Sequence, residues 1–181
     1  MWHDDPVPAA ILLLALLALW LAAGLHKLWR HRQFAGSLSA YALLPQGLIG
    51  AASWLLPLLE LALAAGLIFE RSRAYAGCAG AVTLAVYAAA IGINLRRGRR
   101  QLDCGCLAFG RRKQISAALL GRNAVLALAS LLVGLVPVRA RSLDWVDGWT
   151  ILCGAATLAL LYIAFEGLAE SAQRLPRRRA R

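Results

Sequence analysis

Long apolar runs alternate with short polar stretches along the whole chain. Five of these runs are about 20 residues long, the length that a helix needs to cross the hydrocarbon core of a bilayer. They cover roughly 7–28, 47–69, 74–95, 116–136 and 148–168. Their richness in Ala and Leu favours helix, and no run shows the strict alternation of a transmembrane barrel. The pattern predicts an all-α, polytopic membrane bundle with five spans, formed by residues 1–173, and a basic cytoplasmic tail at 174–181.

Composition and charge agree with a membrane protein. Of the 181 residues, 60% are hydrophobic and 16% are charged, whereas soluble domains average about 25% charged. In a soluble protein, the net charge of +11 would suggest binding to nucleic acid. Here the cations lie between apolar spans, where they orient the chain, so we expect the lipid bilayer and no nucleic acid as a partner.

The distribution of the positive residues predicts the topology. Sixteen of the 20 Lys and Arg residues fall on one side of the five-span arrangement. Because positive loops mark the cytoplasm, we expect the N-terminus outside and the C-terminus in the cytoplasm. The leading residues MWHDDP are acidic, so the first span does not read as a cleaved signal peptide.

The most unusual stretch is RRGRRQLDCGCLAFGRRK at 96–113, where two cysteines are one residue apart in a basic loop. Seven Arg or Lys residues flank Cys104 and Cys106, and Asp103 opposes them slightly. These cations, which include Arg99, Arg100 and Arg111, favour the reactive thiolate.

The one-residue spacing of the two cysteines limits the reactions that they can undergo. A disulfide between Cys104 and Cys106 would be strained and therefore labile, and Gly105 supplies the backbone freedom that it needs. We predict a redox pair. Two thiolates on a shared metal and two incidental loop cysteines remain alternatives, although the chain offers no further Cys or His cluster and we predict no metal site.

Glu60 is the one acidic residue well inside a span. A carboxyl group facing lipid is unfavourable, so we expect Glu60 to face the bundle interior beside a polar partner. Asn94, Thr83 and Tyr87 are the candidates. A hydrogen-bonded structural carboxyl and one that handles protons inside the membrane are both open, and we name Glu60 as a candidate site residue on the second account.

Other polar and small residues have simpler interpretations. We interpret the polar residues at the span ends as interface anchors: His26, Lys27, Arg122 and Asn123. Gly77 and Gly80 begin a small-residue face that should bring two helices of the bundle together. Cys78 and Cys153 are expected to pack as small apolar groups, with a second thiol pair as the alternative.

Four segments occur in the order of a known family. They are FAGSLSAYALLP (34–45), LPLLELALAAGL (56–67), INLRRGRRQLDCGCLAFG (93–110) and ISAALLGRNAVL (115–126). Together they resemble the methylamine utilisation protein MauE family, which is similar in turn to DoxX-like membrane proteins. The resemblance covers roughly 22–128, and its specific part is the Asp-Cys-Gly-Cys element. The family pattern continues Phe-Gly, whereas Leu107 and Ala108 intervene here.

The resemblance implies a role in maturation, by disulfide formation, of the methylamine dehydrogenase small subunit or another exported protein. It implies a thioredoxin-like, MauD-like partner and the bacterial inner membrane. The candidate activity is that of a thiol–disulfide oxidoreductase component; a non-catalytic scaffold or chaperone, or a metal-binding membrane protein, is the alternative. No cofactor is predicted. The likeness to DoxX-like proteins suggests quinone as an alternative cofactor, and a four-span bundle plus one extra helix as an alternative fold.

The charge bias and the implied role disagree about the side of the membrane on which the cysteine pair lies. Disulfides form outside the cytoplasm, yet the bias places Cys104 and Cys106 on the inner side. Electron relay across the bilayer, a loop that dips back into the bundle, and a reductive or sulfur-handling role would each reconcile the two. We favour the relay.

Overall fold

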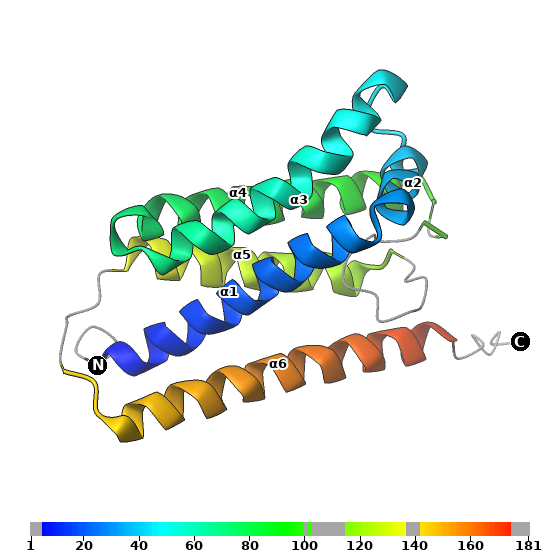
Figure 1. Ribbon diagram of the computed structural model, residues 1–181. Coiled ribbons are helices and arrows are strands. Elements are labelled where there is room, and N and C mark those ends of the chain that lie inside the picture. Colours follow the sequence, from blue (N-terminus) through cyan, green and yellow to red (C-terminus); the bar gives the residue numbers. More distant parts are fainter. Residues whose placement is uncertain (1–4, 100, 103–114, 137–141, 175–181) are drawn as a thin grey trace, which may run out of the picture.

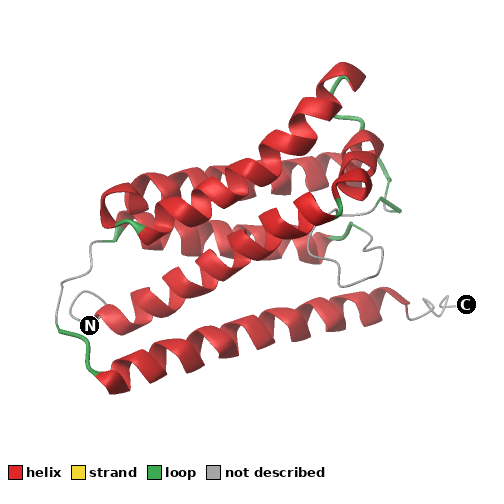
Figure 2. Cartoon of the chain, in the orientation of Figure 1, coloured by secondary structure: helices red, strands yellow, loops and turns green. Residues whose placement is uncertain are grey.

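The computed structural model describes residues 5–99, 101–102, 115–136 and 142–174. It contains six helices, which are α1 (Pro6–Trp29), α2 (His31–Tyr41), α3 (Gln46–Ile68), α4 (Glu70–Arg96), α5 (Ala117–Leu135) and α6 (Trp145–Arg174). Figures 1 and 2 show them as one bundle, with no strand in the described ranges. The predicted all-helical fold is therefore confirmed.

Five of the helices are long and apolar enough to cross a membrane: Pro6–Trp29, Gln46–Ile68, Glu70–Arg96, Ala117–Leu135 and Trp145–Phe165. Each matches one predicted span to within a few residues. The difference is at the C-terminal end, where α6 continues to Arg174. The tail predicted from 174 thus begins with a helical residue, and 175–181 lie outside the described residues.

Helix α1 begins where the sequence provides a cap. The Asp5 side chain accepts a hydrogen bond from the Val7 amide at 3.1 Å, and Pro6 occupies the first turn, where its missing N–H removes no helical bond. Helix α2 is short and ends at Tyr41, followed by the cap residue Ala42, whose φ of 50° is in the left-handed region. This helix follows α1 directly and packs against α3.

The closest helix pairing is between α4 and α5. A Cβ atom on Gly77 would lie only 2.6 Å from the Gly134 Cα atom, so only glycine allows this approach. The Ser130 hydroxyl donates to the Gly77 carbonyl oxygen at 2.8 Å across the same contact. The predicted role of the Gly77 face, packing within one bundle, is confirmed.

The helices pack unevenly around this pair. Helix α1 packs on α3 and α6, and α3 also contacts α4. In Figure 1, α6 lies along one side of the bundle next to α1, and most of its side chains are exposed. Because lipid is as apolar as a leucine core, a helix with an exposed apolar surface is expected in a membrane bundle.

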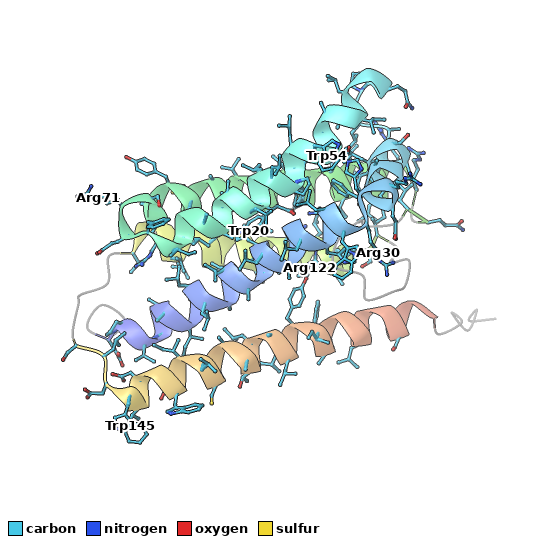
Figure 3. The ribbon with its side chains drawn as sticks, in the orientation of Figure 1. Trp20, Arg30, Trp54, Arg71, Arg122 and Trp145 are labelled. Atoms are coloured by element: carbon cyan, nitrogen blue, oxygen red, sulfur yellow. The ribbon has the colours of Figure 1, made fainter. Side chains whose placement is uncertain are left out.

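The bundle has two ends, which labelled residues locate. Arg30 and Arg71 mark opposite ends, and Trp145 lies at the end of Arg71 (Figure 3). We call the end of Arg30, where α1 and α4 finish and α3 and α5 begin, the loop side. An apolar cluster occupies the other half of the interior and includes Leu16, Leu67, Leu84 and Val133.

Candidate functional site

Glu60 lies inside the bundle, on the third turn of α3 from the helix's C-terminal end. Its side chain is fully buried, with 0% exposure. The Tyr87 hydroxyl on α4 donates a hydrogen bond of 2.8 Å to Glu60 Oε1. Of the three partners proposed from the sequence, the structure selects Tyr87. Burial agrees with the expectation for a carboxyl group in a membrane span.

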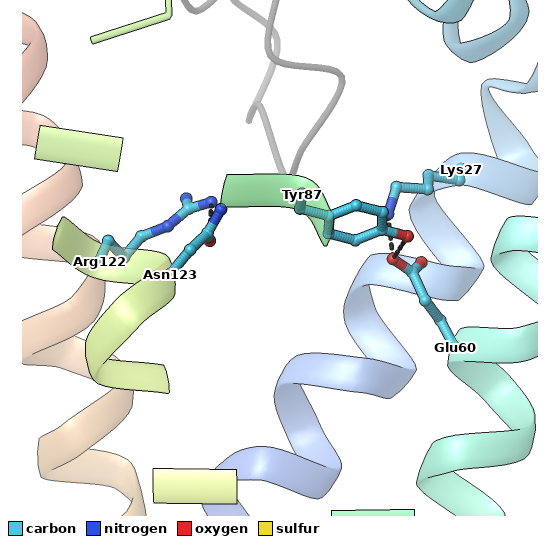
Figure 4. A network of polar contacts seen from close by, with 5 residues as sticks. All are labelled: Lys27, Glu60, Tyr87, Arg122 and Asn123. Atoms are coloured by element: carbon cyan, nitrogen blue, oxygen red, sulfur yellow. Dashed lines mark hydrogen bonds and ion pairs between the residues drawn. The ribbon is translucent and has the colours of Figure 1, made fainter. Parts of the chain in front are cut away.

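Lys27 is the second partner of Glu60. Its Nζ donates to Glu60 Oε1 and forms an ion pair with it (Figure 4). Lys27 comes from the last turn of α1 and is only 4% exposed. The interpretation of Lys27 as an interface anchor is therefore wrong. A long side chain near a helix end usually reaches toward water, but here a buried carboxylate holds it inside.

Aromatic rings surround the ammonium group. The Lys27 Nζ lies 5.0 Å from the centre of the Tyr87 ring and 5.4 Å from that of Phe34. Both distances fall within the range of cation–π attraction. Phe34 is buried on α2, so this helix covers the ion pair on the loop side. The Lys27–Glu60–Tyr87 cluster therefore joins α1, α3 and α4 under a lid formed by α2.

A second contact attaches α2 to α3. His31 Nε2 lies 3.0 Å from the Ser53 hydroxyl, and the His31 ring stacks on Trp54 with centroids 4.1 Å apart. The Ser53 hydroxyl also donates to the Gly50 carbonyl oxygen at 2.7 Å. These contacts fix α2 across the end of the bundle, and with it the position of Phe34.

Polar residues also join α5 and α6. Arg122 donates to the Tyr162 hydroxyl at 3.1 Å, and its guanidinium lies 5.8 Å from the centre of the Tyr162 ring. Arg122 also donates to Asn123 Oδ1 at 3.1 Å. Asn123 is 1% exposed and Arg122 is half-buried. Both were expected to anchor the interface. Instead, Arg122 contacts Tyr162 on α6 and Asn123 is buried, because polar groups in a span are more stable against protein than against lipid.

The cysteine loop begins and ends close to these residues. The Ile115 amide donates to the Leu102 carbonyl oxygen at 3.1 Å, which closes the neck of the loop. Ile115 packs with Ile91 and Leu119, and Tyr41 and Leu102 pack against this group. Cys104, Cys106, Arg100, Asp103 and Arg111 lie outside the described residues. Arg99 is described, and its amide donates to the Asn94 carbonyl oxygen at 3.0 Å.

The remaining two cysteines have free thiols. Cys78 on α4 is half-buried and Cys153 on α6 is exposed. Helix α6 packs chiefly on α1, and a Cβ atom on Gly154 would lie 2.7 Å from the tip of Ile11 there. Cys78 is next to the α4–α5 contact, where its amide faces Gly134. Cys78 and Cys153 therefore do not form the second thiol pair that was the alternative.

The sequence contained one signal that would have limited the partner of Glu60 to two cations. A lone carboxylate in a membrane span needs a cation, and Lys27 and Arg122 are the two cations nearest to the apolar runs. Which of the two pairs with Glu60 depends on helix arrangement, because 33 residues separate Lys27 from Glu60. Sequence spacing does not report that contact.

Together, the fold and the buried cluster define a multi-pass membrane protein with a charged site in its interior. A sequence profile of the methylamine utilisation protein MauE matches residues 6–136. The chain belongs to this family, which confirms the resemblance seen in the four segments.

Individual relatives give the same result. A methylamine utilization protein MauE from Paracoccus denitrificans is 34% identical over 160 residues, covering 88% of this chain and 86% of the relative. Proteins of the same name from Paracoccus versutus and Methylophilus methylotrophus are 37% and 33% identical over 149 and 166 residues. They cover 82% and 89% of this chain, and 80% and 85% of their own lengths. No solved structure matches the chain significantly.

Proposed function

We propose that this protein is a membrane component of thiol–disulfide exchange that serves methylamine utilisation, through maturation of the methylamine dehydrogenase small subunit or another exported protein. The observation that carries the proposal is the Cys104-Gly-Cys106 pair in a chain of the MauE family. The closed neck supports it. Cys104 is two residues from Leu102, so the chain allows at most about 7 Å between them.

The proposed partner is a thioredoxin-like protein, whose disulfide or dithiol is the co-reactant. In one direction, a thiolate of the loop attacks the partner's disulfide and forms a mixed disulfide, and one partner sulfur leaves as a thiolate. The second loop thiolate then attacks the mixed disulfide. The loop ends with an S–S bond, the partner ends with two thiols, and two electrons have moved to the partner. Maturation by disulfide formation uses the reverse direction.

Glu60 has a defined part in this proposal. Each attacking thiol must lose a proton and each leaving thiolate must gain one. A buried carboxylate that is held by Lys27 and Tyr87 can accept and return a proton without exposure to lipid. Tyr87 lies nine residues, or about 13 Å, before the last residue of α4, from which the cysteine loop continues.

The test uses single and double serine variants of the pair. Cys104→Ser and Cys106→Ser should each abolish disulfide exchange with a purified thioredoxin-like partner, while the helical content of the bundle stays the same. Cys78→Ser is the matched control, since its free thiol lies far along α4 from the loop, and it should keep full activity. Full activity in the double serine variant would refute the redox role and favour a scaffold.

Topology is tested separately. In inside-out vesicles, membrane-impermeant thiol reagents should label the reduced pair, because the positive loop is expected in the cytoplasm. In intact cells they should not. Labelling from the outside would refute the proposed orientation and leave the thiol chemistry intact.

A further inference from the structure

We propose that Asn94 and Asn123 hold internal water in the loop-side half of the bundle, and that this water carries protons between the loop side and Glu60. The use of these protons in thiol exchange rests on the function proposed above. The water site itself rests on the geometry of three described helices, α3, α4 and α5, and does not involve the cysteine loop.

Asn94 is the first observation. It is fully buried on α4, with 0% exposure. Its Nδ2 donates to the Ala90 carbonyl oxygen at 3.1 Å, whereas its Oδ1 has no hydrogen-bond partner within the described ranges. Nearly all buried polar atoms are bonded to protein or to water, so such an atom indicates a bound molecule.

Asn123 provides the second observation independently, on α5. Its Oδ1 accepts from Arg122, which fixes the orientation of the amide, because the reverse orientation would place two donors against each other. Its Nδ2 is then a buried donor, and it too lacks a partner among the residues that the structure places. The two amides thus offer one acceptor and one donor, the groups that an internal water uses.

The register of α4 and α5 relates both amides to the charged cluster. These helices are antiparallel: Gly77 lies against Gly134, and Gly92 lies against Leu120. Interpolation between these contacts places Asn123 at the depth of Tyr87. Asn94 is seven residues after Tyr87, two helical turns or about 10 Å closer to the loop side.

The direction of the side chains shortens the distance between the level of Tyr87 and the level of Asn94. Helical side chains lean toward the N-terminus of their helix, so Asn94 leans toward Tyr87. Ile91 lies between them on the same face of α4 and is buried. An axial separation of about 10 Å corresponds to two or three hydrogen-bonded waters in series beside Ile91. In the proposed route, the Tyr87 hydroxyl, which donates to Glu60 Oε1, connects this water to the carboxylate.

The other half of the bundle offers a contrast. Around Leu67 the interior is an apolar cluster. The Ser130 hydroxyl there is bonded to the Gly77 carbonyl oxygen, which leaves Trp20 Nε1 as a single buried donor in the described part of this cluster. An internal water needs two to four polar partners, and one indole N–H among apolar side chains does not supply them. Water should therefore reach Glu60 from the loop side and not from the opposite end.

The site is tested by radical labelling with X-ray pulses in ¹⁸O-water, read by mass spectrometry on the full-length protein in lipid nanodiscs. Ile91 and Leu67 are both buried aliphatic residues, with 2% and 0% exposure. We expect Ile91 to be labelled severalfold more than Leu67, because bound water is the source of the label. Equal labelling in the wild-type protein would refute the proposal without any variant.

Variants identify the residues that hold the water. Asn94→Leu and Asn123→Leu should each lower the labelling of Ile91 severalfold. Thr83→Val is the matched control, because the Thr83 hydroxyl donates to its own helix, to the Ala79 carbonyl oxygen at 2.8 Å. It should change nothing. Labelling of Ile91 that persists in both asparagine variants would show that other groups hold the water.

Proton access is measured by labelling Glu60 with dicyclohexylcarbodiimide, which reacts with protonated carboxyl groups in apolar surroundings. In proteoliposomes, acidification of the loop side should accelerate the labelling severalfold, and acidification of the other side should not. The reverse dependence would refute the proposed route. The Cys104→Ser, Cys106→Ser double variant should behave like the wild type here, so a failure of the thiol function and a failure of the proton route give different results.

Discussion

Breaking the Lys27–Glu60 pair from either side should destabilise the bundle, and removing both charges should restore most of the loss. The two side chains are 5% and 1% exposed, so each charge depends on the other for compensation. Removing one partner of a buried pair costs about 3–5 kcal/mol, whereas replacing both by neutral groups is often close to neutral. We therefore choose Lys27→Met, Glu60→Gln and the double variant.

The structure suggests values at the lower end of that range. The Tyr87 hydroxyl and the proposed internal water would stabilise the charge that remains, so we expect about 3 kcal/mol for each single variant. Full additivity would give about 6 kcal/mol for the double variant. We expect less than about 2 kcal/mol, because neither charge is then left alone in the interior.

The assay is reversible unfolding in mixed micelles with increasing dodecyl sulfate, followed by circular dichroism. The free energies of unfolding of the four proteins form a double-mutant cycle, which isolates the pairwise contribution. Additive losses would refute the reasoning, because they would show that Lys27 and Glu60 do not stabilise each other. Arg71→Met, at an exposed position on the opposite end, is the control and should lie within about 0.5 kcal/mol of the wild type.

Two further predictions use the same unfolding assay. Tyr87→Phe should cost about 1.5 kcal/mol of stability, the lower end of the range for a hydrogen bond to a charged group. A loss larger than that of Lys27→Met would contradict the expectation that the ion pair contributes more than this hydrogen bond. Gly77→Ala should cost about 1–3 kcal/mol, because the added methyl meets backbone at 2.6 Å. Gly154→Ala should cost less, since its methyl meets the flexible tip of an isoleucine, and Gly121→Ala, which opens on free space, should be neutral or stabilising by up to about 1 kcal/mol. Equal losses at all three glycines would show that close backbone approach is not what Gly77 provides.

Much of the architecture is local and was therefore predictable. Helix length, apolar composition and the positions of polar breaks all act within one segment, so the five spans follow from the order of residues. Burial of Glu60 was also predictable, because a carboxylate in lipid is unfavourable in any arrangement of helices. The Gly77 face followed from the spacing of small residues on one helix.

The partners of the buried groups were not predictable in the same way. Lys27, Arg122 and Asn123 are close to span ends, where sequence position favours contact with water. Whether such a side chain reaches outward or inward depends on which neighbour faces it, and that depends on the order and tilt of the packed helices.

The chain sequence is thus sufficient to define a five-span membrane protein of the MauE family with a thiol pair in a basic loop. The packing of α1, α3 and α4 adds the ion pair, because it brings together Lys27 and Glu60 across 33 residues of chain. The same packing buries the amides of Asn94 and Asn123, each with one atom that lacks a partner among the described residues. A residue's tendency to be buried is a property of its side chain, whereas its partner is a property of the assembled bundle.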